Sequence, residues 1–137
     1  MSAVKDLLQG EKNGAISFGD YTLKEKKKKE DFEFDGNIYK VKTFYEITKL
    51  EKNGSFAYES VPGSSVHNFL RRENGVSFDV ESNQDVQITL ELAEETEYVI
   101  YIDEKQAGLM QTNHSGKLTI SVELEEGKPV HVKVMTR

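Results

Sequence analysis

The sequence predicts an all-β protein with an antiparallel β-sandwich or a barrel-like fold. In residues 96–108, 118–124 and 130–134, apolar and polar residues alternate, and a turn-like segment separates each pair of runs. This alternation is typical of antiparallel strands that bury one face. Similar runs recur about every ten residues along the chain, as in sandwiches and barrels. Only residues 3–9, with Val4, Leu7 and Leu8 at helical spacing, favour a short helix.

Four or five strands are expected before Pro62. Residues 15–23 follow the turn signal Asn13-Gly14 and predict the first strand, whereas residues 24–30 are almost all charged and predict a solvated loop. Residues 32–34 and 38–50 predict a hairpin around Asp35-Gly36-Asn37, and residues 55–61 a strand after Asn53-Gly54. In the second hairpin strand, one face is expected to carry Tyr39, Val41, Thr43, Tyr45 and Ile47.

Pro62-Gly63-Ser64-Ser65 is the clearest break in the chain. It predicts either a boundary between two small subdomains, 1–61 and 62–137, or a crossing between two sheets of a single domain. Five or six strands are expected beyond it, over residues 66–70, 76–80, 86–92, 98–102, 118–124 and 130–134.

Composition narrows the classes of function. The 137 residues suit one domain or two small ones, and the net charge of −6 disfavours nucleic acid as a partner. The chain has no cysteine, so it has neither disulfides nor a thiolate zinc site. No apolar run approaches the ~20 residues of a membrane span. The N-terminal residues lack the apolar core of a signal peptide, which predicts a cytoplasmic protein.

No residue set in the sequence predicts catalysis. Ser64 and Ser65 precede His67, but no nucleophile elbow surrounds them, and Gly-Ser-Ser after a proline is ordinary loop sequence. The three histidines are far apart, which predicts no metal site, and no cofactor motif is present. The many carboxylates lie mostly at turns or on polar strand faces. The lysines of residues 26–29 are flanked by acidic residues, which favours a flexible loop over a site for an acidic partner.

Four residues are the candidates for binding. Tyr45, Tyr58 and Tyr101 each adjoin a residue better placed for the core, so they are expected to be partly exposed. Exposed rings stack on sugars, although a protein without tryptophan carries only a weak signal of this kind. Asp103 lies in the turn at 103–105, the first candidate for a contact with a partner in the C-terminal half.

Two resemblances add to these expectations. Residues 98–103, Gly108 and the pattern Asn113-x-x-Gly116-x-Leu118-x-Ile120-x-Val122 resemble small C-terminal β-sandwich modules of bacterial surface and polysaccharide-processing proteins. Those modules carry a strand, a tight turn and a following strand with a small residue; here Glu104 replaces the usual turn glycine. Nearly the whole chain resembles short proteins of gut Firmicutes that bear the label "endosialidase", through residues 14–23, 39–44, 46–51 and 58–63.

The label implies glycan cleavage, but the residues for it are absent. Sialidases grip the sugar carboxylate with three arginines from separate strands, and this chain has only Arg71, Arg72 and Arg137. A six-bladed propeller needs roughly two dozen strands, against about ten expected here. The sequence therefore predicts a non-catalytic protein that binds a protein or glycan, or assembles, through a sheet face or edge. A carbohydrate-binding or glycan-processing module and a structural homo-oligomer subunit are the alternatives.

Overall fold

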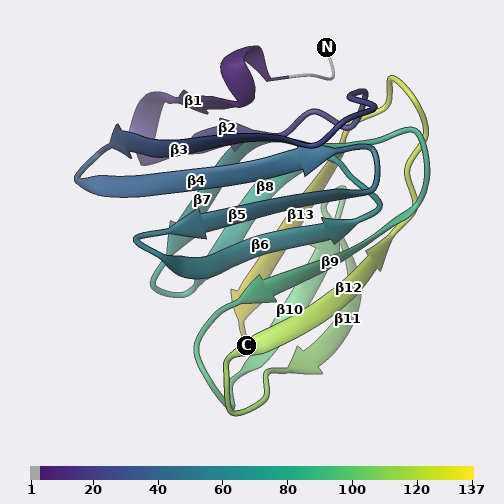
Figure 1. The fold of residues 1–137 in the computed structure, drawn as a ribbon. Coiled ribbons are helices and arrows are strands. Elements are labelled where there is room, and N and C mark those ends of the chain that lie inside the picture. The colour runs from purple at the N-terminus through teal and green to yellow at the C-terminus, as the bar shows by residue number, and fades with distance from the viewer. Residues whose placement is uncertain (1–3) are drawn as a thin grey trace.

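The computed structural model describes residues 4–137 and shows two antiparallel sheets packed face to face (Figure 1). The all-β sandwich predicted from the sequence is confirmed. One sheet has seven strands in the order β1 (Leu8–Gly10), β2 (Ile16–Phe18), β7 (Ser65–Arg72), β8 (Gly75–Glu81), β13 (Val130–Thr136), β10 (Glu97–Ile102) and β11 (Lys105–Gln111). The other has six, in the order β12 (Lys117–Val122), β9 (Val86–Glu91), β6 (Ser55–Val61), β5 (Ile47–Lys52), β4 (Asn37–Phe44) and β3 (Lys27–Phe34).

A single hydrophobic core fills the space between the sheets. Tyr58 of β6 lies at its centre, fully buried, with its ring edge-on to Phe18, Phe69 and Phe78 at centroid distances of 5.1, 5.9 and 5.7 Å. These three phenylalanines come from β2, β7 and β8 of the facing sheet. Edge-to-face aromatic pairs stabilise beyond their buried area, so this cluster fastens the two sheets together.

The expected N-terminal helix does not form. Of residues 3–9, the first lies outside the described residues, Lys5–Leu7 make one 3-10 turn, and the chain then enters β1. Asp6 and Leu7 have positive φ, which ends helical hydrogen bonding. β1 pairs instead with β2, and Leu8 enters the common core. Tertiary pairing here overrides a helical spacing of only three apolar residues.

The lysine-rich run is a strand rather than a loop. Lys27 to Glu30 belong to β3, the edge strand of the six-stranded sheet, and pair with β4. The expected long strand over 38–50 is two strands, β4 and β5, joined by a turn at Tyr45-Glu46. Before the turn, the odd-numbered residues of β4 point into the core; after it, the even-numbered residues Thr48 and Leu50 of β5 do so. Tyr45, in the turn itself, is 48% exposed.

Residues 62–64 carry the chain from β6 of one sheet to β7 of the other. The chain therefore crosses between the sheets at this point, and strands from both sides of Pro62 pair in each sheet, as β2 with β7 and β6 with β9. A buried hydroxyl network holds this crossing. The Thr48 hydroxyl donates to the Ser64 carbonyl at 2.8 Å and accepts from the Ser64 amide at 3.0 Å.

The phenol of Tyr58 gives the fold a dependence on alkaline pH. Burial raises the pKa of Tyr58 far above its usual range, while hydrogen bonds with Ser64 and Ser60 partly oppose that increase. The unfolded chain ionises its tyrosines near pH 10, so stability present below about pH 10 is lost as pH rises toward the higher folded pKa. We expect Tyr58→Phe to reduce the loss of stability between about pH 9 and 11.5, measured as urea midpoints. An unchanged pH dependence in the variant would contradict this assignment.

Candidate functional site

Four lysines lie on the outer surface of the strands β3, β4 and β5, and a fifth, Lys26, immediately precedes β3. This basic face consists of Lys26, Lys28, Lys40, Lys42 and Lys49. Lys28, Lys42 and Lys49 are direct cross-strand partners, in the order β3, β4, β5. Adjacent strands lie about 4.8 Å apart, so the three side chains form one transverse row. With Glu51 beside them, four of these lysines surround a hollow of about 30 Å³, the size of a water molecule or small ion.

Repulsion among Lys28, Lys42 and Lys49 is unfavourable in the protein alone, and Glu59 of β6 offsets it only at the Lys49 end of the row. Like charges directly opposite one another on neighbouring strands destabilise a sheet. Desolvation lowers the pKa of Lys42, and Lys26, Lys49, Lys28 and Lys40 lower it further by repulsion. Glu51 lines the hollow, and Glu59 of β6 is the other cross-strand partner of Lys49. The five lysines and these two carboxylates carry a local charge of +3 in a chain whose net charge is −6. An acidic protein therefore concentrates positive charge on one sheet surface.

Apolar side chains border the basic face at both ends of β4. Ile38 shares the outer face of β4 with Lys40 and is 50% exposed; Tyr45 follows the other end of the strand. Tyr45 stands edge-on to Phe44 at 5.4 Å, and the Lys26 ammonium lies 5.8 Å from the Phe44 ring centroid. Val61, at the end of β6, is also 50% exposed. The surface thus combines a lysine row with apolar margins.

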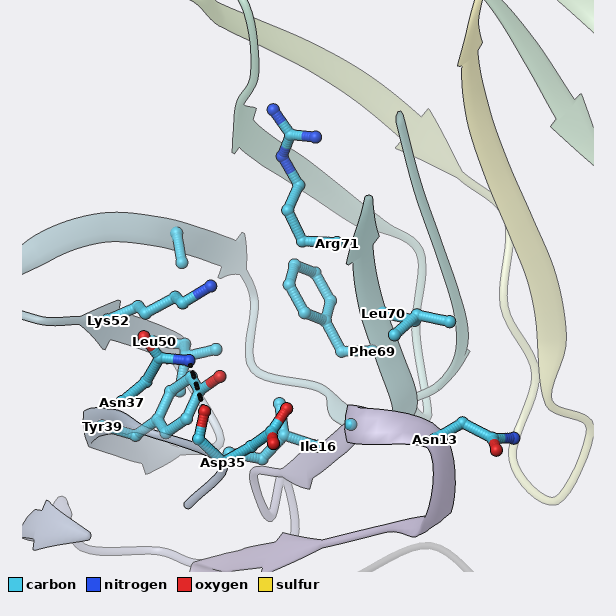
Figure 2. A pocket seen from close by; sticks show the side chains of 12 residues that line it. Asn13, Ile16, Asp35, Asn37, Tyr39, Leu50, Lys52, Phe69, Leu70 and Arg71 are labelled. Atoms are coloured by element: carbon cyan, nitrogen blue, oxygen red, sulfur yellow. Dashed lines mark hydrogen bonds between the residues drawn. The ribbon is translucent and has the colours of Figure 1, made fainter. Parts of the chain in front are cut away.

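A separate pocket of about 260 Å³ lies at the tip of the β3–β4 hairpin, between residues of the two sheets (Figure 2). Its apolar floor comes from β2, β5, β6 and β7: Ile16, Leu50, Ala57, Phe69 and Leu70. Its polar rim comes from two turns and three strands: Asn13, Asp35, Asn37, Tyr39, Lys52 and Arg71. The pocket is therefore amphipathic, with apolar groups below and charged groups of both signs above.

The four binding residues predicted from the sequence fall in three separate places. Tyr45 lies at the margin of the basic face, exposed as expected. The expected exposure of Tyr58 is wrong: its ring is fully buried and its hydroxyl bonds Ser64 Oγ at 2.8 Å, so it cannot stack on a ligand. Tyr101 and Asp103 lie together at the end of β10 on the other sheet. The sequence interpretation missed Lys40, Lys42 and Lys49.

The Tyr101 and Asp103 region is held by internal contacts. The Lys133 ammonium lies 5.3 Å from the centroid of the half-buried Tyr101 ring. Asp103 Oδ1 accepts a hydrogen bond from the His131 amide at 2.9 Å. Asp103 and Glu104 both have positive φ in the two-residue turn between β10 and β11, a conformation that glycine adopts more easily. Asp103 thus fastens this hairpin to β13.

Within residues 4–137, the side chains of Ser64, Ser65 and His67 do not hydrogen-bond one another. Ser64 Oγ bonds Tyr58 and Ser60 inside the core, whereas Ser65 Oγ and His67 Nε2 are buried without a partner among the described residues. Cross-strand pairing brings His67, Asp79 and His131 to one row, and His131 Nδ1 lies 2.9 Å from Asp79 Oδ1.

No group of three acidic, histidine or cysteine residues within 4–137 could hold a metal ion. Over the same residues, no helix is long and apolar enough to cross a membrane.

Comparison with known proteins identifies no protein similar to this chain. No family model, no curated protein and no solved structure matches the chain. The two resemblances noted in the sequence therefore stay predictions, and a function has to be inferred from the basic face and the pocket.

Proposed function

We propose that this protein is a non-catalytic binding protein whose basic face takes an acidic segment of another polypeptide. The observation that carries the proposal is the row Lys28, Lys42 and Lys49, three like charges paired directly across β3, β4 and β5. A row of this kind costs stability in the free protein. Carboxylates laid over it would replace the repulsion among the lysines with attraction.

The apolar margins favour a polypeptide over other anions. An extended peptide presents side chains on one side about every 6.8 Å, which is also the spacing of Lys40 and Lys42 along β4. Ile38 and Tyr45, beyond either end of that lysine pair, can contact apolar residues that flank an acidic run. The rest of the chain has a charge of −9, the difference between the net −6 and the local +3, and repels anionic surfaces of large extent such as bilayers and nucleic acid.

Fluorescence anisotropy with a labelled peptide of six glutamates flanked by leucines tests the proposal. We expect saturable binding that the triple variant K28Q/K42Q/K49Q weakens by about tenfold or more, since removing charge-assisted hydrogen bonds raises Kd. The matched control, K12Q/K105Q/K128Q, removes the same total charge from exposed lysines elsewhere and is expected to keep the wild-type Kd.

Three outcomes would contradict the proposal. The first is an equal decrease of affinity in the two triple variants, which would indicate net charge alone. The second is wild-type affinity in K28Q/K42Q/K49Q. The third is binding of single-stranded DNA, a polyuronate or anionic vesicles to the basic face in a buffer in which the peptide does not bind. That result would assign this face to another class of partner.

A further inference from the structure

We propose that the pocket at the β3–β4 hairpin tip binds a free α-amino acid with an apolar side chain. This goes beyond the basic face, because the pocket uses different residues and faces the interior of the sandwich rather than its outer surface. The two sites can be tested independently. The inference rests on opposite charges that both line the pocket and on the apolar floor between the sheets.

Asp35 and Lys52 supply the two charges. Both line the pocket, and Figure 2 shows them on different sides of Tyr39. No ion pair joins them, and within residues 4–137 neither side chain makes a hydrogen bond or a salt bridge. A carboxylate and an ammonium that share a pocket without contacting each other match the two charged groups of a zwitterion.

The turn at Asn13-Gly14 leaves space for the Asp35 carboxylate. A Cβ atom at Gly14 would lie 2.9 Å from Asp35 Oδ2, and Gly14 has a φ of +80°, so glycine suits this position on both grounds. The ammonium of the ligand is therefore assigned to Asp35. The phenol of Tyr39 lies beside it: burial raises the Tyr39 pKa, the negative charge of Asp35 raises it further, and a hydrogen bond with Asn37 partly opposes both.

Lys52 is the cation available for the ligand carboxylate. The other cation of the rim, Arg71, directs its guanidinium away from the Asp35 side in Figure 2 and donates to the carbonyls of Arg72 and Gly75 at the β7–β8 turn. Asn37 is also fixed, because its Nδ2 donates to the Asp35 carbonyl at 3.2 Å and its Oδ1 accepts from Asn53 at 2.9 Å. Other groups thus hold Arg71 and Asn37, and Asp35 and Lys52 remain as one charge of each sign open to a ligand.

The apolar floor and the volume of the pocket determine which ligand side chain fits it. Ile16, Leu50 and Phe69 are buried and offer only apolar surface to the pocket. The volume of about 260 Å³ is below the range of about 300–1,000 Å³ for drug-sized ligands, which suits a molecule of amino-acid size. A phosphate would find only Lys52 to pair with, and a lipid would meet a charged rim, so neither fits as well.

Isothermal titration calorimetry with three small probes tests the inference. L-phenylalanine carries both charges, 3-phenylpropionate lacks the amine, and phenethylamine lacks the carboxylate. We expect L-phenylalanine to bind at least about tenfold tighter than either analogue, because each analogue leaves one rim charge unpaired. Equal affinities for the three probes, or no binding of L-phenylalanine at about 10 mM, would overturn the inference.

Substitutions then assign the roles. Asp35→Asn is expected to weaken L-phenylalanine binding by about tenfold without weakening 3-phenylpropionate, whereas Lys52→Gln should weaken L-phenylalanine without weakening phenethylamine. Ala57→Leu fills the floor and is expected to weaken all three probes. The control K28Q/K42Q/K49Q keeps the pocket intact and should bind L-phenylalanine as the wild type does, so failure of the basic face and failure of the pocket are distinguishable. Wild-type affinity in both Asp35→Asn and Lys52→Gln would overturn the inference.

Discussion

Replacing Tyr58 by alanine is expected to lower the free energy of unfolding by about 3–5 kcal/mol, the range for large buried aromatic residues. The ring is fully buried and contacts aromatic side chains of three strands in the facing sheet. Alanine would leave a cavity between the sheets and leave the Ser64 hydroxyl with one partner fewer. Since small domains have about 5–15 kcal/mol of total stability, this one change removes a large share of it.

Urea unfolding followed by circular dichroism measures this effect. Tyr45→Ala is the matched control, because the same atoms are removed from a residue that is 48% exposed at the β4–β5 turn. Its expected cost is about 1 kcal/mol or less, mostly from the edge-on contact with Phe44. Equal costs for the two variants would show that the aromatic cluster does not hold the sheets together.

Thr48→Val is expected to cost about 2–4 kcal/mol, although valine has nearly the same shape as threonine. The Thr48 hydroxyl bonds both the amide and the carbonyl of Ser64, and it also bonds Thr43 Oγ1 at 2.8 Å. Valine would remove this partner from both buried backbone groups at the crossing between the two sheets. Leaving a buried polar group unsatisfied costs about 1–3 kcal/mol.

Thr89→Val controls for the change of residue type. Thr89 also pairs its hydroxyl with a threonine hydroxyl, that of Thr119 at 3.0 Å, but on the exposed face of the same sheet. Water can replace that partner, so we expect a change within about 0.5 kcal/mol. A decrease in stability in Thr48→Val no larger than in Thr89→Val would contradict the role of the hydroxyl network.

Alternation of apolar and polar residues was sufficient to predict most of the sandwich, because strands with one exposed face have a two-residue period in the sequence. It failed where a short turn interrupts the period. The turn between β4 and β5 consists of Tyr45 and Glu46, and neither residue is a glycine or proline that would have indicated a turn in the sequence. β11 shows little alternation, since it is an edge strand with exposed Ala107 and Leu109.

The basic face could not be predicted from the linear order of the charges. Lys26 to Lys29 are flanked by acidic residues in sequence, which indicated a solvated loop. In the fold, Lys28 lies in a strand and meets Lys42 and Lys49 through pairing that depends on the register of two hairpins. The alternation of Lys40 and Lys42 with the buried Tyr39 and Val41 was the available signal.

The exposure of individual tyrosines could not be predicted from the sequence either. Tyr45 and Tyr58 both adjoin apolar residues in sequence, yet one lies in a turn and the other at the centre of the core. Tyr58 of β6 pairs with the buried Leu50 of β5 and shares its inward face, whereas Tyr45 lies in the turn between β4 and β5. The pocket likewise joins Asn13, Asp35 and Arg71, residues whose proximity comes only from sheet packing.

The most direct test of the proposed function is an amide NMR titration of the wild-type protein with the six-glutamate peptide. We predict that the largest shifts fall on residues 26–28, 40–45 and 49–51, with small shifts over β10, β11 and β13. The shifts should disappear in K28Q/K42Q/K49Q and persist in K12Q/K105Q/K128Q. Shifts centred instead on the other sheet, or spread evenly over the surface, would contradict the assignment of the basic face as the binding site.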